Sequence, residues 1–403
     1  MNASTTTTTA QFADIARDPG PWSQVYLDAS VDTGDPPQVT LERAKSAADQ
    51  LSRTGAPPGD VEAVTDALSA ELPAPSPLSH FVLVKEGVVV VDEWMPGYPV
   101  QPEIISFGPV PDLVPLVARQ PPGFHVLVVE TDRAGGEIRF YSAQTPSAES
   151  ETHVQGRTDT LHAVKSGGWR QDLLQSHARE IWRQTQAELA AAVNEIVHRE
   201  HPRLLVVAGE VSARQPLEGE LSTESRDILS TLPIDTRADG SEPGALQRFV
   251  DQEIDRVLAA EKASVLDRIA MHEGRGDGTV ATRFGEVVNA LSAAQAETLM
   301  MNVDLLRYRT VLALDRAPWI ATAPEDVAAA EILAVVDAPA GLVRAAILTD
   351  ATIHVTDRDP DPNLDAEASR DAASDPIDTR TLPGDAAVAA LLRWPLGPPV
   401  PAT

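Results

Sequence analysis

Cysteine is absent from this chain of 403 residues. The absence excludes disulfide bonds, a thiolate nucleophile and zinc sites built on cysteine. A chain without cysteine also suits a reducing compartment, and we expect the protein to be cytoplasmic.

Long apolar runs are absent as well. A transmembrane helix needs roughly 18 consecutive apolar residues, and no run in the chain approaches that length. The N-terminus, from Met1 through the threonines at 5–9, lacks the basic and apolar regions of a signal peptide. Because 43% of the residues are hydrophobic, we expect a soluble protein with ordinary folded cores and no membrane partner.

Basic residues are scarce: 32 lysines and arginines stand against 60 acidic residues, for a net charge of −28. Such a surface repels phosphate backbones at long range, so we expect no DNA partner and no general affinity for bare RNA. The charge is uneven, however. Between His162 and Arg183, four basic residues meet two acidic ones, a net charge of +2 (four minus two). A solvated helix face of mixed charge explains this window most simply, and a locally basic binding element is the alternative.

A pair of glycines lies within this window. The segment Lys165-Ser166-Gly167-Gly168-Trp169-Arg170-Gln171 precedes a stretch that we predict to be one long helix, from Asp172 to His201. Adjacent glycines admit backbone conformations that a Cβ would forbid. Apolar-face residues recur after them at helical spacing: Leu174, Ala178, Ile181, Trp182, Thr185, Leu189, Val193 and Ile196. The pattern predicts an exposed loop held on a rigid amphipathic helix, although an ordinary surface loop has the same features.

Hydrophobic periodicity divides the rest of the chain into the strands and helices of an α/β protein. Strands are predicted at 22–28, 80–85, 87–92, 124–131, 137–143, 203–208 and 297–302, with one or two more in 342–355. Helices are predicted at 41–51, 61–72, 222–231, 245–271, 279–291, 324–336 and 386–393. At about 100–200 residues per domain, the length predicts two or three domains.

Alternating aspartates at Asp357, Asp359 and Asp361 resemble the start of a calcium-binding EF-hand loop. Pro362, however, stands where the turn glycine belongs, and Ala368 replaces the bidentate glutamate. We therefore predict a solvated, mobile acidic loop across 357–385 rather than a metal site.

Two histidines, His198 and His201, lie three residues apart at the end of the long predicted helix. They could ligate a metal, but a third ligand and a general-base glutamate at the spacing of zinc proteases are missing. Histidines near a helix C-terminus also interact favourably with the helix dipole, which is the explanation we favour.

No other motif indicates enzyme chemistry. Gly274-Arg275-Gly276-Asp277-Gly278 lacks the Gly-Lys-Ser/Thr ending of a phosphate-binding loop and is predicted to be a flexible linker. The sequence also contains no Gly-x-Ser-x-Gly nucleophile elbow. We therefore expect a binding protein without metal or cofactor rather than an enzyme.

Three passages, 124–141, 165–192 and 279–304, occur in the order of the archaeal–eukaryotic class I release factor and Pelota superfamily and resemble it. They look like the opening hairpin of its middle domain, the loop and long helix of that domain, and the opening of its C-terminal domain. The likeness is to the bacterial branch, which contains the ribosome-hibernation factor Balon. It implies an N-terminal α/β domain at 1–122, with residues 1–12 disordered. An RNase H-like middle domain would follow at 123–262, and then a C-terminal α/β sandwich at 263–403, like kink-turn-binding ribosomal proteins.

In release factors the loop reads Gly-Gly-Gln and promotes hydrolysis of peptidyl-tRNA in the peptidyl-transferase centre. Here Gly167 and Gly168 match, but Trp169 occupies the place of the glutamine, and Gln171 lies two residues further on. The resemblance thus implies delivery of the loop into the ribosome without hydrolysis. The first segment matches none of the family's codon-reading motifs, so stop-codon recognition is not expected.

The resemblance predicts a hibernation or translation-silencing factor that occupies the A site of idle 70S ribosomes. Residues predicted to contact ribosomal RNA of the peptidyl-transferase centre are Arg157, His162, Lys165, Ser166, Gly167, Gly168, Trp169, Arg170 and Gln171. The basic side chains would meet phosphates, and Trp169 would stack on a base. In the family the C-terminal domain contacts a translational GTPase, which in the hibernation branch is elongation factor Tu.

Two alternatives stay open. The protein could be a peptidyl-tRNA hydrolase that rescues stalled ribosomes, using Gln171 or a water held by the glycine amides. It could also be a stress-related interaction protein that kept the fold and no longer binds ribosomes.

Overall fold

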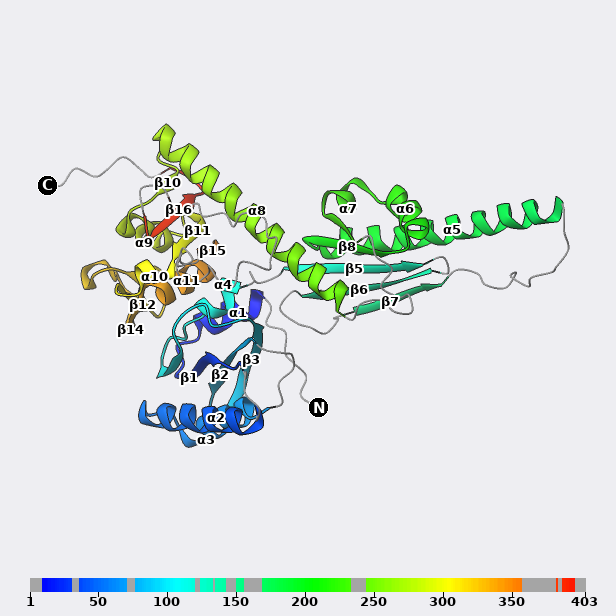
Figure 1. The fold of residues 1–403 in the computed structure, drawn as a ribbon. Helices are drawn as coiled ribbons and strands as arrows, with labels where there is room; N and C mark the ends of the chain where they lie inside the picture. The colour runs from blue at the N-terminus through cyan, green and yellow to red at the C-terminus, as the bar shows by residue number, and fades with distance from the viewer. Residues whose placement is uncertain are drawn as a thin grey trace, which may run out of the picture. The chain divides into compact units, whose positions relative to one another are not determined.

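A computed structural model describes residues 9–30, 36–70, 77–119, 124–132, 135–142, 150–155, 169–232, 244–356, 382 and 386–395. The chain forms two compact units: residues 1–122 together with 262–403, and residues 123–261. Both are built of strands and helices (Figure 1), which confirms the predicted α/β class. The division into three domains stays a prediction. No helix in the described ranges is long and apolar enough to cross a membrane.

The first unit contains an antiparallel sheet with helices on both faces. Its strands are β1 (Trp22–Asp28), β2 (Leu78–Lys85), β3 (Val88–Pro96) and β4 (Ile104–Gly108), in the order β3-β2-β1-β4. Successive side chains of a strand point to opposite faces. Val25 and Leu27 therefore pack with α2 (Pro36–Arg53) and α3 (Pro58–Leu68), whereas Tyr26 packs with α1 (Thr9–Arg17) and α4 (Val114–Arg119). The strand and hairpin predicted in this segment are confirmed, as is the helix at 41–51.

The same unit contains a second sheet, ordered β10-β16-β11-β15, and a three-stranded sheet, ordered β13-β12-β14. Their strands are β10 (Val280–Ala281), β11 (Ala296–Asn302), β12 (Thr310–Leu314), β13 (Ile320–Ala321), β14 (Ile332–Asp337), β15 (Thr352–Thr356) and β16 (Val388–Leu392). The helices α9 (Phe284–Ser292), α10 (Val303–Leu306) and α11 (Ala338–Leu348) pack against them. From α11, the buried Arg344 donates a hydrogen bond through Nε to the carbonyl oxygen of Ala16, at 2.7 Å. This contact ties α11 to the end of α1.

Two predictions in this segment are wrong, and a third is correct in part. Residues 324–336 form a short 3-10 helix (Pro324–Asp326) and β14 rather than one helix, because the apolar run at 332–336 pairs with β12. Of the one or two strands predicted in 342–355, one is confirmed as β15, whereas the first part of that range belongs to α11, whose first turn Pro339 suits. Residues 386–393 contain the strand β16 instead of a helix, since pairing with β10 and β11 overrides the helix propensity of its alanines.

The second unit is a five-stranded sheet, ordered β7-β6-β5-β8-β9. β5 (His125–Asp132), β6 (Gly135–Ser142) and β7 (Ser150–Gln155) are antiparallel, whereas β8 (Leu204–Gly209) and β9 (Leu229–Leu232) run parallel to β5. This is the strand order of RNase H-like domains, which is the fold expected for this segment.

Helices cover both faces of the five-stranded sheet. Leu127 and Val129 pack with α5 (Trp169–Glu200) and α6 (Val211–Glu220), and α7 (Thr223–Asp227) contacts α5. On the other face, Val126 and Val128 pack with the first half of α8 (Ala245–Arg275). The long helix predicted after the glycine pair is confirmed as α5. The helix predicted at 222–231 is wrong in its second half, where β9 extends the buried sheet.

Candidate functional site

The structure describes the base of the predicted contact loop. Arg157, His162, Lys165, Ser166, Gly167 and Gly168 lie outside the described residues. Trp169, Arg170 and Gln171 form the first turn of α5, which begins three residues earlier than predicted. For these three residues the structure describes the backbone but not the side chains. The contacts predicted for these nine residues stay predictions.

The helix α5 carries the loop. It has 32 residues, and at about 1.5 Å per residue its axis is about 48 Å long. Its buried positions among the described side chains, Thr185, Gln186, Leu189, Ala190, Val193 and Val197, recur every three or four residues. Figure 1 shows the N-terminal part of α5 running past the strands of its sheet. The glycine pair therefore precedes a long helix whose C-terminal half is packed against the sheet.

A buried glutamine joins α5 to the tip of the β5–β6 hairpin. The Gln186 side chain is 1% exposed, and its Oε1 accepts a hydrogen bond from the Thr131 hydroxyl at 3.0 Å. Its Nε2 donates to the carbonyl oxygen of Asp132 at 2.9 Å. The Asp132 carboxylate in turn accepts from the Gly135 backbone N–H at 3.0 Å. Both ends of the glutamine amide are thus bonded, and the end of β5 is fixed to the helix.

Two glycines permit the close packing around this hairpin. A Cβ on Gly136 would lie 2.5 Å from the Cδ2 of Leu189, so only glycine lets α5 approach β6 this closely. Gly209, at the end of β8, has φ +141°, and a Cβ there would lie 2.0 Å from the Thr131 carbonyl oxygen. Neither residue was singled out from the sequence, because a glycine in a strand does not reveal what approaches it.

A hollow of about 440 Å³ opens between α5 and α6. Trp182, Arg183 and Gln186 line it from α5, and Ser212, Ala213, Pro216, Gly219 and Glu220 line it from α6. Apart from Trp182, no sequence pattern indicates this hollow, since α6 is not among the predicted helices. Its walls combine an indole, a guanidinium and a carboxylate, and these groups can bind a flat, charged ligand.

The wall formed by α6 is held by side chains from neighbouring helices. Arg226 donates from Nη2 to the Gly219 carbonyl oxygen at 2.7 Å, and Asn194 donates from Nδ2 to the Glu220 carbonyl oxygen at 3.3 Å. The Asn194 side-chain oxygen accepts from the Ser222 backbone N–H at 2.9 Å. The carbonyls at the C-terminus of α6, which a helix cannot satisfy itself, are therefore bonded, and the wall is preformed.

The histidine pair at the end of α5 lies against a single carboxylate. The Nδ1 atoms of His198 and His201 each lie 3.4 Å from a carboxylate oxygen of Glu224. Within the described ranges, no group of three metal-binding side chains comes together. His201 has φ +47° just past the helix, a position in which its positive charge would interact favourably with the helix terminus.

The glycine-rich segment at 274–278 is a helix end, and the acidic loop is largely undescribed. Gly274 belongs to the last turn of α8, while Gly276 and Gly278 have φ of +61° and +73°. Hydrogen bonds from Thr279 lower the pKa of the Asp277 carboxyl to about 2. The segment is therefore an ordered turn rather than the predicted flexible linker. Of the residues at 357–385, only Leu382 is described, so the acidic-loop prediction lies outside the described residues.

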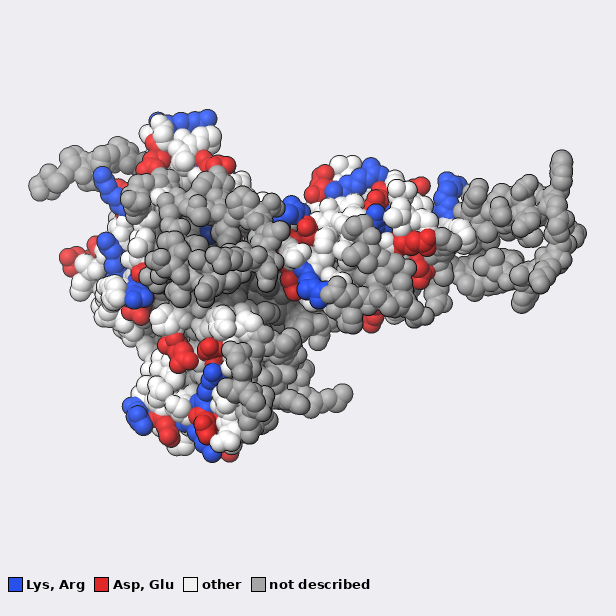
Figure 2. All heavy atoms as spheres, in the orientation of Figure 1, with Lys and Arg blue, Asp and Glu red and all other residues white. Residues whose placement is uncertain are grey.

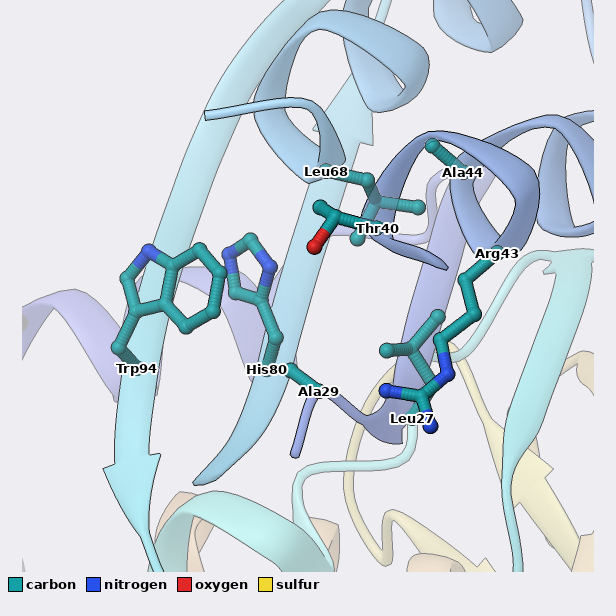
Figure 3. A pocket seen from close by; sticks show the side chains of 8 residues that line it. All are labelled: Leu27, Ala29, Thr40, Arg43, Ala44, Leu68, His80 and Trp94. Carbon is teal, nitrogen blue, oxygen red and sulfur yellow. The ribbon is translucent and has the colours of Figure 1, made fainter. Parts of the chain in front are cut away.

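A second, much smaller cavity lies in the first unit, between α2 and strands β1 to β3 (Figure 3). His80 is 1% exposed, and its ring stacks on Trp94 with centroids 3.7 Å apart. Its Nε2 lies 2.6 Å from the Asp92 carboxylate, but burial lowers the pKa of His80 below its ordinary value. With about 10 Å³ of space, the cavity holds at most one water and is a packing feature.

Charges of both signs are interspersed over the described surface. Figure 2 shows acidic and basic side chains interspersed among the described residues, with no broad basic face in this view. Many basic groups are paired, as Arg203 is with Glu261 and Arg268 with Glu297. A basic face that would bind RNA over a wide area is therefore not visible on the described surface in this view.

Comparison with known proteins relates the second unit to a protein family. Residues 125–275, from β5 to the end of α8, match the model of bacterial archaeo-eukaryotic release factor family 2. This match confirms the predicted relation to the release factor and Pelota superfamily. It does not identify the chain with the hibernation factor Balon.

Sequence relatives and solved structures are more distant. Two uncharacterised proteins of Mycobacterium tuberculosis strains are each 23% identical over 283 residues, covering 70% of this chain and 75% of theirs. Pelota from Archaeoglobus fulgidus is 15% identical with a TM-score of 0.31, over 67% of this chain and 64% of its own. A ribosome-bound archaeal Pelota is 14% identical with a TM-score of 0.40, over 97% of this chain and 95% of its own. At such TM-scores these structures carry no conclusion about function.

Proposed function

Because residues 125–275 form a domain of the release factor and Pelota superfamily, we propose that this protein binds the ribosome and silences it without catalysis. In this proposal the protein occupies the A site of idle 70S ribosomes. The loop at 165–171 reaches the peptidyl-transferase centre from the N-terminus of α5. The observation that carries the proposal is the placement of Gly167 and Gly168 immediately before a 32-residue helix in the family-matched domain.

The loop sequence favours binding over hydrolysis. In this proposal Trp169 fills the position where a release factor presents its reactive glutamine. An indole offers no amide to position a hydrolytic water, but it can stack on a nucleobase. We therefore expect occupancy of the centre with the ester bond of peptidyl-tRNA left intact.

Charge distribution supports a contact limited to the loop. The window from His162 to Arg183 has a net charge of +2, so the rest of the chain carries −30 (−28 minus 2). Each phosphate contact to a single RNA strand steepens the dependence of log Kd on log salt by about 0.7. Replacing Lys165 and Arg170 by glutamate should weaken binding and flatten that slope by about 1.4. An unchanged slope would count against this loop as the contact.

The proposal extends to a protein partner. An acidic surface suits contact with proteins better than with RNA, and the C-terminal segment would bind elongation factor Tu. Sedimentation tests both contacts: purified protein is spun with vacant 70S ribosomes, with and without elongation factor Tu and with tRNA in the A site. We expect the protein to sediment stoichiometrically with the ribosomes, and we expect tRNA in the A site to abolish this binding. Absence from the ribosome fraction under every condition would overturn the proposal in favour of an interaction protein that no longer binds ribosomes.

One observation favours a hydrolytic alternative. Gln171 lies in the first turn of α5, two residues from the family's reactive position, and a water held by glycine amides could assist it. Incubation of the protein with ribosomes carrying labelled peptidyl-tRNA separates the two functions. If the protein releases the peptide and Gln171→Ala abolishes this release, the function is ribosome rescue by hydrolysis rather than silencing.

A further inference from the structure

The hollow between α5 and α6 lies apart from the loop contacts and has walls suited to a base and its phosphate. We propose that it binds one unpaired guanine nucleotide of ribosomal RNA. The inference rests on the proposed ribosome binding and adds a second RNA contact further along the same helix.

The size and the aromatic wall of the hollow fit a nucleotide. Its volume of about 440 Å³ falls within the range of about 300–1,000 Å³ of small-ligand pockets. Trp182 lines it from α5, and an indole face provides a stacking surface for a base. Ala213 and Pro216 form the apolar part of the facing wall.

The charged groups of the two walls give the preference for guanine. Arg183, beside Trp182, belongs to the locally basic window, and its guanidinium suits a phosphate. Glu220 lines the α6 wall, and its carboxylate is an acceptor of two hydrogen bonds. Guanine presents two adjacent N–H donors on its Watson–Crick edge, whereas adenine and cytosine pair one donor there with acceptors. A carboxylate facing a stacked base therefore selects guanine.

The backbone beneath the walls of the hollow is held by hydrogen bonds from neighbouring elements. The Gln186 amide is bonded at both ends to the β5–β6 hairpin, at 3.0 Å and 2.9 Å. The carbonyls of Gly219 and Glu220 are bonded by Arg226 and Asn194. Little ordering of the backbone is therefore needed on binding, which favours affinity.

Gly219 allows the hollow to be filled without disturbing the fold. It lines the hollow, and a Cβ built on it meets no heavy atom within 4 Å. Its φ is not in the left-handed region, so a side chain is tolerated. Gly219→Phe should occupy the space of the base, and Gly219→Ala is the matched control that leaves it open.

The first assay does not depend on the ribosome. A labelled seven-nucleotide RNA of adenosines with one central guanosine is titrated with the full chain by fluorescence anisotropy. The same RNA with a central cytidine is the reference, and free GMP is measured by equilibrium dialysis. We expect the guanosine RNA to bind at least tenfold more tightly than the cytidine RNA, and GMP, which carries the same base and phosphate, to bind as well. Gly219→Phe should abolish that difference, Gly219→Ala should retain it, and Glu220→Gln should remove the preference while the protein stays folded by circular dichroism.

The second assay is ribosome sedimentation with the same variants. Loss of at least tenfold in ribosome affinity for Gly219→Phe, with Gly219→Ala unchanged, supports the proposal. If the wild type sediments with ribosomes and Gly219→Phe sediments equally well, the guanine site is overturned and the proposed function is not. If the wild type does not sediment, the proposed function fails, and the heptamer titration alone decides whether the hollow recognises guanine in RNA. No preference for guanosine over cytidine, or no binding of GMP, overturns the proposal in either case.

Discussion

Removal of the Gln186 amide should loosen the hairpin against the helix that carries the loop. Gln186→Ala deletes the acceptor of the Thr131 hydroxyl and the donor to the Asp132 carbonyl oxygen, bonds of 3.0 Å and 2.9 Å in a buried setting. Thr131 keeps a second acceptor, the Gly135 carbonyl oxygen at 3.1 Å, so the larger penalty falls on Asp132. At about 1 kcal/mol net for each bond, the expected loss of stability is about 2 kcal/mol.

That loss corresponds to a measurable shift in melting temperature. The second unit has 139 residues, from 123 to 261. An unfolding entropy of about 2.1 cal/mol/K per residue gives about 0.3 kcal/mol/K for it, so about 2 kcal/mol lowers its Tm by about 7 °C. Hydrogen exchange should accelerate at the Gly135 amide, which donates to the Asp132 carboxylate, because loss of the Gln186 bonds lets this end of the hairpin open more often.

Gln184 provides the matched control. It is the same residue type on the same helix, but its Nε2 bonds only to the exposed Glu188, at 3.2 Å. Gln184→Ala should therefore change stability by less than about 0.5 kcal/mol. If the two variants have equal melting temperatures and equal rates of hydrogen exchange at the Gly135 amide, the proposed role of Gln186 in holding the hairpin is refuted.

Two further predictions concern backbone strain and a buried carboxyl. Gly209→Ala should lower the free energy of unfolding by about 3 kcal/mol or more, because φ is +141° and the new Cβ would lie 2.0 Å from the Thr131 carbonyl oxygen. Chemical denaturation measures this loss, and Gly219→Ala, whose Cβ meets open space, is the control. Burial raises the pKa of Asp112 to about 6. The folded state then binds this proton more tightly than the unfolded state, so the group's contribution to stability falls as pH rises from about 4 to about 6. Asp112→Asn should lose that dependence, and parallel slopes for variant and wild type would contradict it.

The sequence predicts the elements whose patterns are local. The long helix after the glycine pair, the first strand and the hairpin were predicted because periodicity and turn residues are legible within about ten residues. The strand β16 is not predicted, because Val-Ala-Ala-Leu-Leu becomes a strand only through pairing with β10 and β11. These two partner strands lie about 100 residues earlier in the sequence. The same holds for β9, a short strand that only the sheet edge at β8 defines.

The site was predictable only in its exposed part. A glycine pair before an amphipathic helix is visible in the sequence, and it directed attention to the loop. Gln186 resembles any polar residue on a helix until Thr131, 55 positions earlier, is brought against it. Gly219 and Glu220 face Trp182 only after α6 folds back onto α5. The hollow is therefore a product of tertiary packing, and Trp182 alone gave no reason to expect it.

The length of α5 bears on how an acidic protein would meet ribosomal RNA. From Trp169 to the buried Thr185 the helix rises sixteen residues, which is about 24 Å along its axis at about 1.5 Å per residue. The Debye length is about 8 Å at physiological ionic strength, so this separation is about three screening lengths. Repulsion between the acidic body and RNA at the loop is then weak, and the local charge of +2 dominates there. A shorter helix would bring the negative body within range of the phosphates. Under the proposed function, deletion of two whole turns from α5 should therefore weaken ribosome binding most at low salt, where the acidic field extends furthest.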